Sequence, residues 1–173
     1  MTDLGKMHYF LSIEVKQIVS GIFIRQKKYA QEVLERFQMG NCNSVQTSIV
    51  PGTKLTKDVD GIKVDSTHFK HIVWSLMYLT TTRPDLMFVV SLISRFMESP
   101  TELHFQAAKR VLRYLKGIVD STHFKQSFGL LYKRKSEANL VGYSDSDYGG
   151  DLEDRKSTLG YVFMFSSVAV AWL

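Results

Sequence analysis

The sequence lacks the residues and runs that mark several classes of protein. Its 173 residues include a single cysteine, Cys42, which excludes an intrachain disulfide and a cysteine-based zinc site. No apolar run reaches about 18 residues, and the N-terminus has no signal-peptide core. We therefore expect no membrane partner and a cytoplasmic or nuclear, non-secreted protein. A hydrophobic content of 45% is ordinary for a folded chain and argues against wholesale disorder.

The net charge of +5 is unevenly distributed. Residues 137–173 hold two basic and six acidic residues, a balance of −4. Residues 1–136 hold 20 basic and 11 acidic residues, a balance of +9. Residues 1–136 thus form a basic body and residues 137–173 an acidic tip. This distribution suits a protein whose basic part contacts phosphate and whose acidic part holds metal. An unevenly charged, solvated surface is the alternative, and charge alone does not decide between them.

The acidic tip begins with a predicted strand at 140–145. The pair Gly149-Gly150 predicts a turn, and a second strand is expected at 159–165. The strand's period of two places Asp145 and Asp147 on one face at its C-terminal end. Such carboxylates either reach water or meet a cation, and Mg²⁺ accepts one or two carboxylates while keeping waters. An acidic hairpin loop without metal is the other interpretation, because Asp-rich turns are common.

The N-terminal segment predicts a β-hairpin followed by a helix. Alternating apolar residues across 7–15 predict a half-buried strand, which turns at Ser20-Gly21 and pairs with 21–25. Residues 26–39 then follow an amphipathic helical pattern that ends at Gly40. The side chains expected to point inward are Tyr29, Val33, Leu34 and Phe37.

The middle of the chain predicts a connector at 41–64 and three helices. The first runs over 66–79, and the second begins at Pro84 and runs to Met97. The third has Ser99 as its N-cap in a capping box and ends at Gly117. Its expected buried stripe is Ala108, Val111, Leu112 and Leu115. Its basic residues, our candidates for contacting nucleic acid, are Lys109, Arg110, Arg113 and Lys116.

Residues 139–165 read NLVGYSDSDYGGDLEDRKSTLGYVFMF, which closely resembles the start of the ribonuclease H domain in copia-type (Ty1/copia) retrotransposon Pol polyproteins. The segment DRKSTLGY carries the most specific part of this resemblance. It implies that Asp145 is the first metal-binding, catalytic carboxylate of the nuclease, with Mg²⁺ as the cofactor. A third strand of this sheet is expected at 168–172.

The resemblance covers nearly all of residues 2–172. DLGKMHYFLSIEV and GIFIRQKKYAQEVLERF resemble the copia reverse transcriptase just after its polymerase active site. There the hairpin that carries Phe10 and Leu11 resembles the primer grip, which holds the primer end; the family has Gly where Ser12 stands. HIVWSLMYLTTTRPDLMFVVSLISRFMESPTELHFQAAKRVLRYLKG resembles the region between polymerase and nuclease.

The sequence also departs from the family. It has no adjacent Asp-Asp pair, so we expect the polymerase metal site to lie outside the chain, and the family's catalytic Glu is expected beyond Leu173. The heptapeptide VDSTHFK occurs twice, at 64–70 and 119–125. We interpret the second copy as an insertion that lengthens a loop before a strand around FGLLYKRK, at a small cost in stability.

Together these patterns predict an α+β fold. Residues 1–40 would form the last palm hairpin and its helix. Residues 41–136 would form a thumb or connection region with a cluster of three helices, and 137–173 a truncated ribonuclease H-like antiparallel sheet of three strands.

The predicted function is that of a fragment of a reverse transcriptase/ribonuclease H, itself inactive. The fragment would bind an RNA–DNA hybrid or duplex weakly, would not hold Mg²⁺ stably, and has other polyprotein segments as further candidate partners. A non-catalytic nucleic-acid-binding remnant and a decayed element without selected function are the alternatives.

Overall fold

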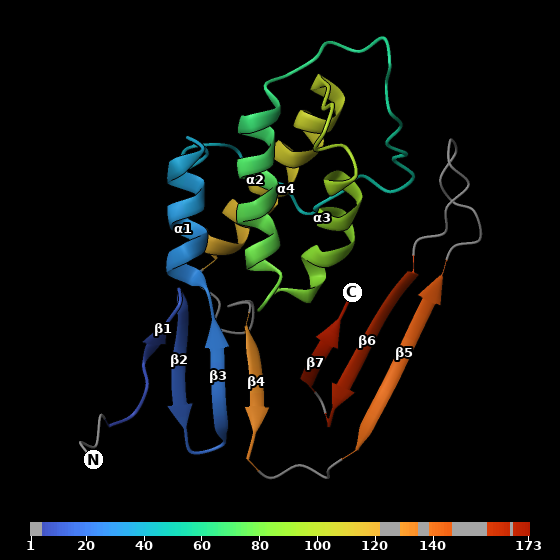
Figure 1. Ribbon diagram of the computed structural model, residues 1–173. Helices are drawn as coiled ribbons and strands as arrows, with labels where there is room; N and C mark the ends of the chain where they lie inside the picture. The colour runs from blue at the N-terminus through green and yellow to red at the C-terminus, as the bar shows by residue number, and fades with distance from the viewer. Residues whose placement is uncertain (1–4, 122–128, 135–138, 147–158, 167) are drawn as a thin grey trace.

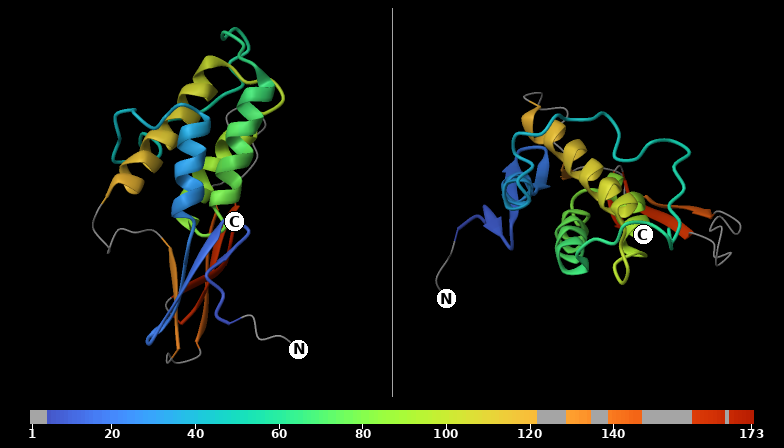
Figure 2. Two further views of the ribbon diagram at one scale, coloured as in Figure 1. Left: turned by 90° about the vertical axis from the view of Figure 1, so that its left-hand side faces the viewer. Right: turned by 90° about the horizontal axis from the view of Figure 1, so that it is seen from above.

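The computed structural model describes residues 5–121, 129–134, 139–146, 159–166 and 168–173. Within them, helices gather at one end of the molecule and two antiparallel sheets extend from the other (Figures 1 and 2). This arrangement confirms the α+β prediction. No helix in the described ranges is long and apolar enough to cross a membrane.

The N-terminal hairpin has one more reversal than the sequence pattern predicted. Strands β1 (Tyr9–Phe10) and β2 (Ile13–Ile18) pair through a tight turn at Leu11-Ser12, where the φ angles are 45° and 60°. The prediction of a single strand over 7–15 is therefore wrong. Alternation of apolar residues does not reveal that two consecutive residues adopt the left-handed backbone conformation. Positive φ at both turn residues matches the twist of the flanking strands. The reversal from β2 into β3 (Gly21–Arg25) is confirmed.

A fourth strand completes this sheet from far along the chain. Strand β4 (Leu130–Lys133) pairs antiparallel with β3, from Ile24 opposite Leu130 to Gly21 opposite Lys133. A Cβ atom on Gly21 would lie 2.0 Å from the Tyr132 carbonyl oxygen, so only glycine fits this close approach. The sequence indicated a strand near β4 but not its partner.

Four α-helices share one apolar core. They are α1 (Lys27–Arg36), α2 (Ser66–Leu79), α3 (Met87–Ser94, preceded by the 3₁₀ turn η1, Pro84–Leu86) and α4 (Glu102–Asp120). The predicted inner face of α4 is confirmed, because its four apolar residues are buried. α1 contributes Ala30, Val33 and Leu34 to the same core, so the N-terminal helix packs with the other three.

Helix α1 ends before the predicted stop at Gly40. Gln38 adopts a left-handed conformation, with φ 57°. The Met39 amide donates to the Leu34 carbonyl at 2.7 Å, and the Gln38 amide donates to the Glu35 carbonyl at 3.0 Å. These two bonds form a Schellman motif with glutamine in the position that usually holds glycine.

Helix α4 starts and ends later than predicted. Its N-cap is Thr101 rather than Ser99, and His104 closes the capping box in place of Glu or Gln. The helix continues through Gly117, where a Cβ atom would lie 3.0 Å from Cβ of Ser44 in the connector. Gly117 therefore serves packing rather than termination.

Helix α3 is shorter than the predicted 84–97. After Ser94, the amides of Phe96 and Met97 donate to carbonyls three residues earlier, which tightens the chain into turns.

The C-terminal sheet has the three predicted strands in the order β5 (Leu140–Ser146), β6 (Leu159–Phe165) and β7 (Val168–Trp172). The Trp172 indole donates from Nε1 to the Thr80 carbonyl at the end of α2, at 3.0 Å. Because Val168 and Ala169 are also buried, β7 fixes this sheet against the rest of the fold.

Candidate nucleic-acid interface

The turn between β1 and β2 presents two exposed apolar side chains at a fixed position. Phe10 and Leu11 are 56% and 66% exposed. The Tyr78 hydroxyl of α2 donates to the Leu11 carbonyl, which ties the turn to the helical layer. The Lys28 ammonium lies 5.5 Å from the centre of the Tyr9 ring. Exposed aromatic surface beside a cation is the composition on which nucleic-acid bases stack.

The basic side chains of α4 are half-buried and partly engaged. The Lys109 ammonium lies 4.1 Å from the centre of the Phe105 ring, and Lys116 pairs with Asp120 at 2.7 Å. Arg110 donates to the Thr47 hydroxyl in the connector at 3.0 Å. Among the residues that the structure describes, the buried Nε atoms of Arg110 and Arg113 have no hydrogen-bond partner. This surface is therefore less open than the solvated stripe that the sequence pattern indicates.

The structure does not bring these two sets of predicted residues together. Helix α4 lies on one side of α1 and α2, while the β1–β2 hairpin lies on the other (Figure 2). Each set forms its own surface.

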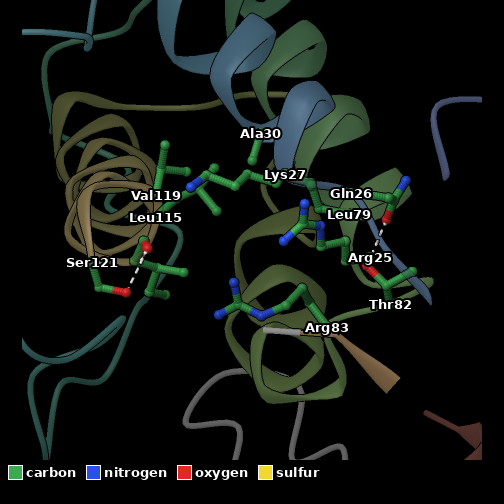
Figure 3. A pocket seen from close by; sticks show the side chains of 11 residues that line it. Arg25, Gln26, Lys27, Ala30, Leu79, Thr82, Arg83, Leu115, Val119 and Ser121 are labelled. Atoms are coloured by element: carbon green, nitrogen blue, oxygen red, sulfur yellow. Dashed lines mark hydrogen bonds between the residues drawn. The ribbon is translucent and has the colours of Figure 1, made fainter. Parts of the chain in front are cut away.

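A pocket that sequence reasoning missed lies where the helices meet the four-stranded sheet (Figure 3). Its empty volume is about 430 Å³, including the open mouth. Three cationic residues line it: Arg25 and Lys27 at the junction of β3 and α1, and Arg83 after α2. No local pattern predicts that Arg83 joins the other two, because long-range packing brings it there.

Carboxylates fix both arginines of this pocket. Arg25 pairs with Glu14 at 3.0 Å, and Arg83 pairs with Asp85 through two bonds of 2.7 and 2.5 Å. The Tyr114 hydroxyl donates to the same Asp85 carboxylate at 3.3 Å. Burial raises the pKa of Tyr114 above its ordinary value, and the Asp85 charge adds to that shift. Tyr114 therefore stays a neutral donor that helps to orient Asp85.

Asp145, the predicted metal ligand, lies exposed on β5 opposite Gly160 of β6. The other acidic residues of this region, Asp147, Asp151, Glu153 and Asp154, lie outside the described residues. In the part of the chain that is described, no three His, Cys, Asp or Glu side chains gather to hold a metal ion. The described residues thus supply one carboxylate here, which does not by itself fit a two-metal site.

Known proteins resemble this chain over nearly its whole length. A family model described as "Reverse transcriptase (RNA-dependent DNA polymerase)" matches residues 1–51. The chain is 37% identical over 170 residues to the retrovirus-related Pol polyprotein from transposon RE1 of Arabidopsis thaliana, and 36% identical over 181 residues to that from transposon TNT 1-94 of Nicotiana tabacum. These matches cover 98% and 99% of this chain but 11% and 13% of the two polyproteins.

A shorter relative matches over most of its own length. An uncharacterised mitochondrial protein of Arabidopsis thaliana is 36% identical over 173 residues, which cover 99% of this chain and 68% of that protein. No solved structure matches the fold significantly.

Proposed function

Because the chain belongs to the copia-type retrotransposon Pol polyprotein family, we propose that it is a fragment of a reverse transcriptase/ribonuclease H that holds nucleic acid without catalysing a reaction. Its ligand in this proposal is an RNA–DNA hybrid or another duplex, bound weakly. The parent activities would be RNA-directed DNA synthesis and cleavage of hybrid RNA.

The observation that carries this proposal is the anchored β1–β2 turn. Tyr78 holds the Leu11 carbonyl, so Phe10 and Leu11 stand exposed on an ordered turn instead of a free tail. An ordered apolar contact binds with less loss of conformational entropy than a flexible one. Lys109 and Arg113 of α4 would add sequence-independent attraction to phosphates from a second surface.

The metal in this proposal is Mg²⁺, with Asp145 as one of its ligands. A single carboxylate supports loose binding at most, because two-metal hydrolysis needs several carboxylates in fixed positions. Other segments of the polyprotein would supply the missing ligands and are the proposed protein partners, in the cytoplasm or nucleus.

Titration of a labelled RNA–DNA hybrid at rising salt tests the binding. We expect dissociation constants of about 10⁻⁴–10⁻⁶ M, with affinity that falls as salt rises. The double variant Lys109→Gln/Arg113→Gln should reduce the salt slope by roughly one per lost phosphate contact. Phe10→Ala should weaken binding with little change in slope, because it removes stacking rather than charge.

The matched control is Lys54→Gln, which removes one exposed charge from the connector and should leave the slope unchanged. An affinity that does not respond to salt would contradict the proposal. Absence of binding at low salt would favour a decayed element without selected function.

Hybrid cleavage with Mg²⁺ or Mn²⁺ tests the lack of catalysis. We expect no product from the wild-type chain or from Asp145→Asn, since one fixed carboxylate cannot position two ions. Cleavage that disappears in Asp145→Asn would show that neighbouring acids complete the site.

A further inference from the structure

We propose that the pocket lined by Arg25, Lys27 and Arg83 binds a phosphate group carried on a small organic body, such as a nucleotide. None of these three residues belongs to the surfaces assigned above to duplex nucleic acid.

The inner surface of the pocket is positively charged. Arg25, Lys27 and Arg83 line it, whereas the carboxylates of Glu14 and Asp85, which hold the two arginines, are not among the lining residues. Three cations thus line the cavity, and no described carboxylate does. Charges near low-dielectric walls act more strongly than charges in open water, and such clefts focus the field on an anion.

The carboxylates also orient the guanidinium groups. Arg83 donates two hydrogen bonds to Asp85, and Arg25 donates one from Nε to Glu14 while its Nη2 lies 3.0 Å from the same oxygen, so both guanidinium groups are oriented before any ligand arrives. Fixed, planar donors suit the oxygens of a phosphate, because little side-chain entropy is lost on binding. Lys27 is the first residue of α1, so the positive end of that helix lies at the same place.

The rest of the pocket lining is largely apolar. Leu79 of α2 and Leu115 and Val119 of α4 are lining residues, and Figure 3 shows Lys27 extending toward Leu115 and Val119. The Thr82 and Ser121 hydroxyls also line it; they donate to the Gln26 side chain at 2.9 Å and to the Ile118 carbonyl at 3.0 Å, so their oxygens can accept a bond from the ligand. An apolar wall beside cations and a few polar groups suits a phosphate carried on a small molecule with an aromatic or sugar body.

Calorimetric titration of the whole chain with adenosine monophosphate and with inorganic phosphate tests this site. The variant is Lys27→Glu, because Lys27 is exposed and its replacement should not disturb the fold. Its matched control is Lys54→Glu, which makes the same charge change at an exposed residue of the connector outside the pocket lining. We expect Lys27→Glu to weaken nucleotide binding at least about tenfold and Lys54→Glu to change it by less than about twofold.

Amide chemical shifts locate the bound ligand independently of affinity. Adenosine monophosphate should shift the amide signals of Lys27, Arg83 and Ser121 in the wild-type chain and not in Lys27→Glu. Lack of binding by the wild-type chain, or equal weakening by both variants, would overturn the proposal.

A competition experiment identifies the source of the phosphate. If adenosine monophosphate displaces a labelled hybrid, the pocket takes a backbone phosphate; if both bind together, it takes a free nucleotide. Either result supports a phosphate site. Loss of hybrid binding with intact nucleotide binding would count against the proposed function alone.

Discussion

At the scale of single residues, the hydrogen bonds of the buried His104 side chain depend on its protonation state. Its Nδ1 accepts a bond from the Thr101 amide at 2.9 Å, and its Nε2 lies 2.8 Å from the Thr56 carbonyl. The ring also stacks on Phe96, with centroids 4.0 Å apart. Only the neutral ring with its proton on Nε2 can make both bonds, because a protonated Nδ1 cannot accept. His104 therefore caps α4 only while it is neutral.

The stability of the chain should consequently fall in mild acid. Burial lowers the pKa of His104 below its ordinary value of 6.5, despite opposing effects from the Thr56 carbonyl and Asp58. Below about pH 6.5 the unfolded chain then binds more protons than the folded chain, so the free energy of unfolding decreases as the pH falls. Thermal unfolding at about pH 7.5 and 5.5 measures this loss.

His104→Gln is the matched variant, because glutamine closes a capping box without titrating. It should lose less stability than the wild-type chain between the two pH values. Parallel losses in both proteins would show that other groups cause the pH dependence.

At the scale of elements, the interiors of the helices and strands were more predictable than their ends. Periodicity located α2, which buries a regular set of apolar residues, and runs of β-branched and aromatic residues located β6 and β7. The ends depend instead on the backbone conformation of single residues. Gln38 is left-handed, for example, and a glutamine in the sequence does not predict that conformation. The Leu11-Ser12 turn is similar: glycine is the family residue at Ser12, and the φ of 60° there gives that preference a physical reason.

A substitution at the C-terminal end of α1 should stabilise the protein. Gln38→Gly places glycine in the left-handed position and should raise the free energy of unfolding by about 0.5–1 kcal/mol. Gln31→Gly is the matched control in the same helix, where glycine should lower it by about 1 kcal/mol. Urea unfolding monitored by circular dichroism measures both. Equal effects of the two substitutions would mean that the Schellman geometry does not form in solution.

At the scale of the whole molecule, the structure joins parts that the sequence suggested as separate. The division at 40 and 136 into three domains stays a prediction, but α1 lies in the common core, β4 pairs with β3, and Trp172 bonds to Thr80. These contacts join segments that are distant in the sequence, and no sequence pattern predicts them. The candidate site divides in the same way: the sequence indicated Phe10, Leu11 and the basic residues of α4, while the pocket formed by Arg25, Lys27 and Arg83 required the folded chain.

The bond between Trp172 and Thr80 should control how firmly the C-terminal sheet is held. Trp172→Phe removes the indole donor, and one hydrogen bond contributes about 0.5–1.5 kcal/mol. Amides of β5–β7 should therefore exchange about 2- to 12-fold faster, with little change in α2 and α4. Trp74→Phe, at an exposed residue of α2, is the control and should change neither. Uniform acceleration over the whole chain would mean that sheet and helices open as one unit.

The same bond provides an optical signal. The chain has two tryptophans, and they stand in different surroundings: Trp74 is 55% exposed, whereas Trp172 is half-buried with its indole nitrogen bonded. In Trp74→Phe, all tryptophan fluorescence comes from Trp172. A red shift of that emission would then mark release of β7 from α2. The far-ultraviolet circular dichroism signal follows unfolding of the helices, so comparing the two signals would show whether β7 is released before the helices unfold.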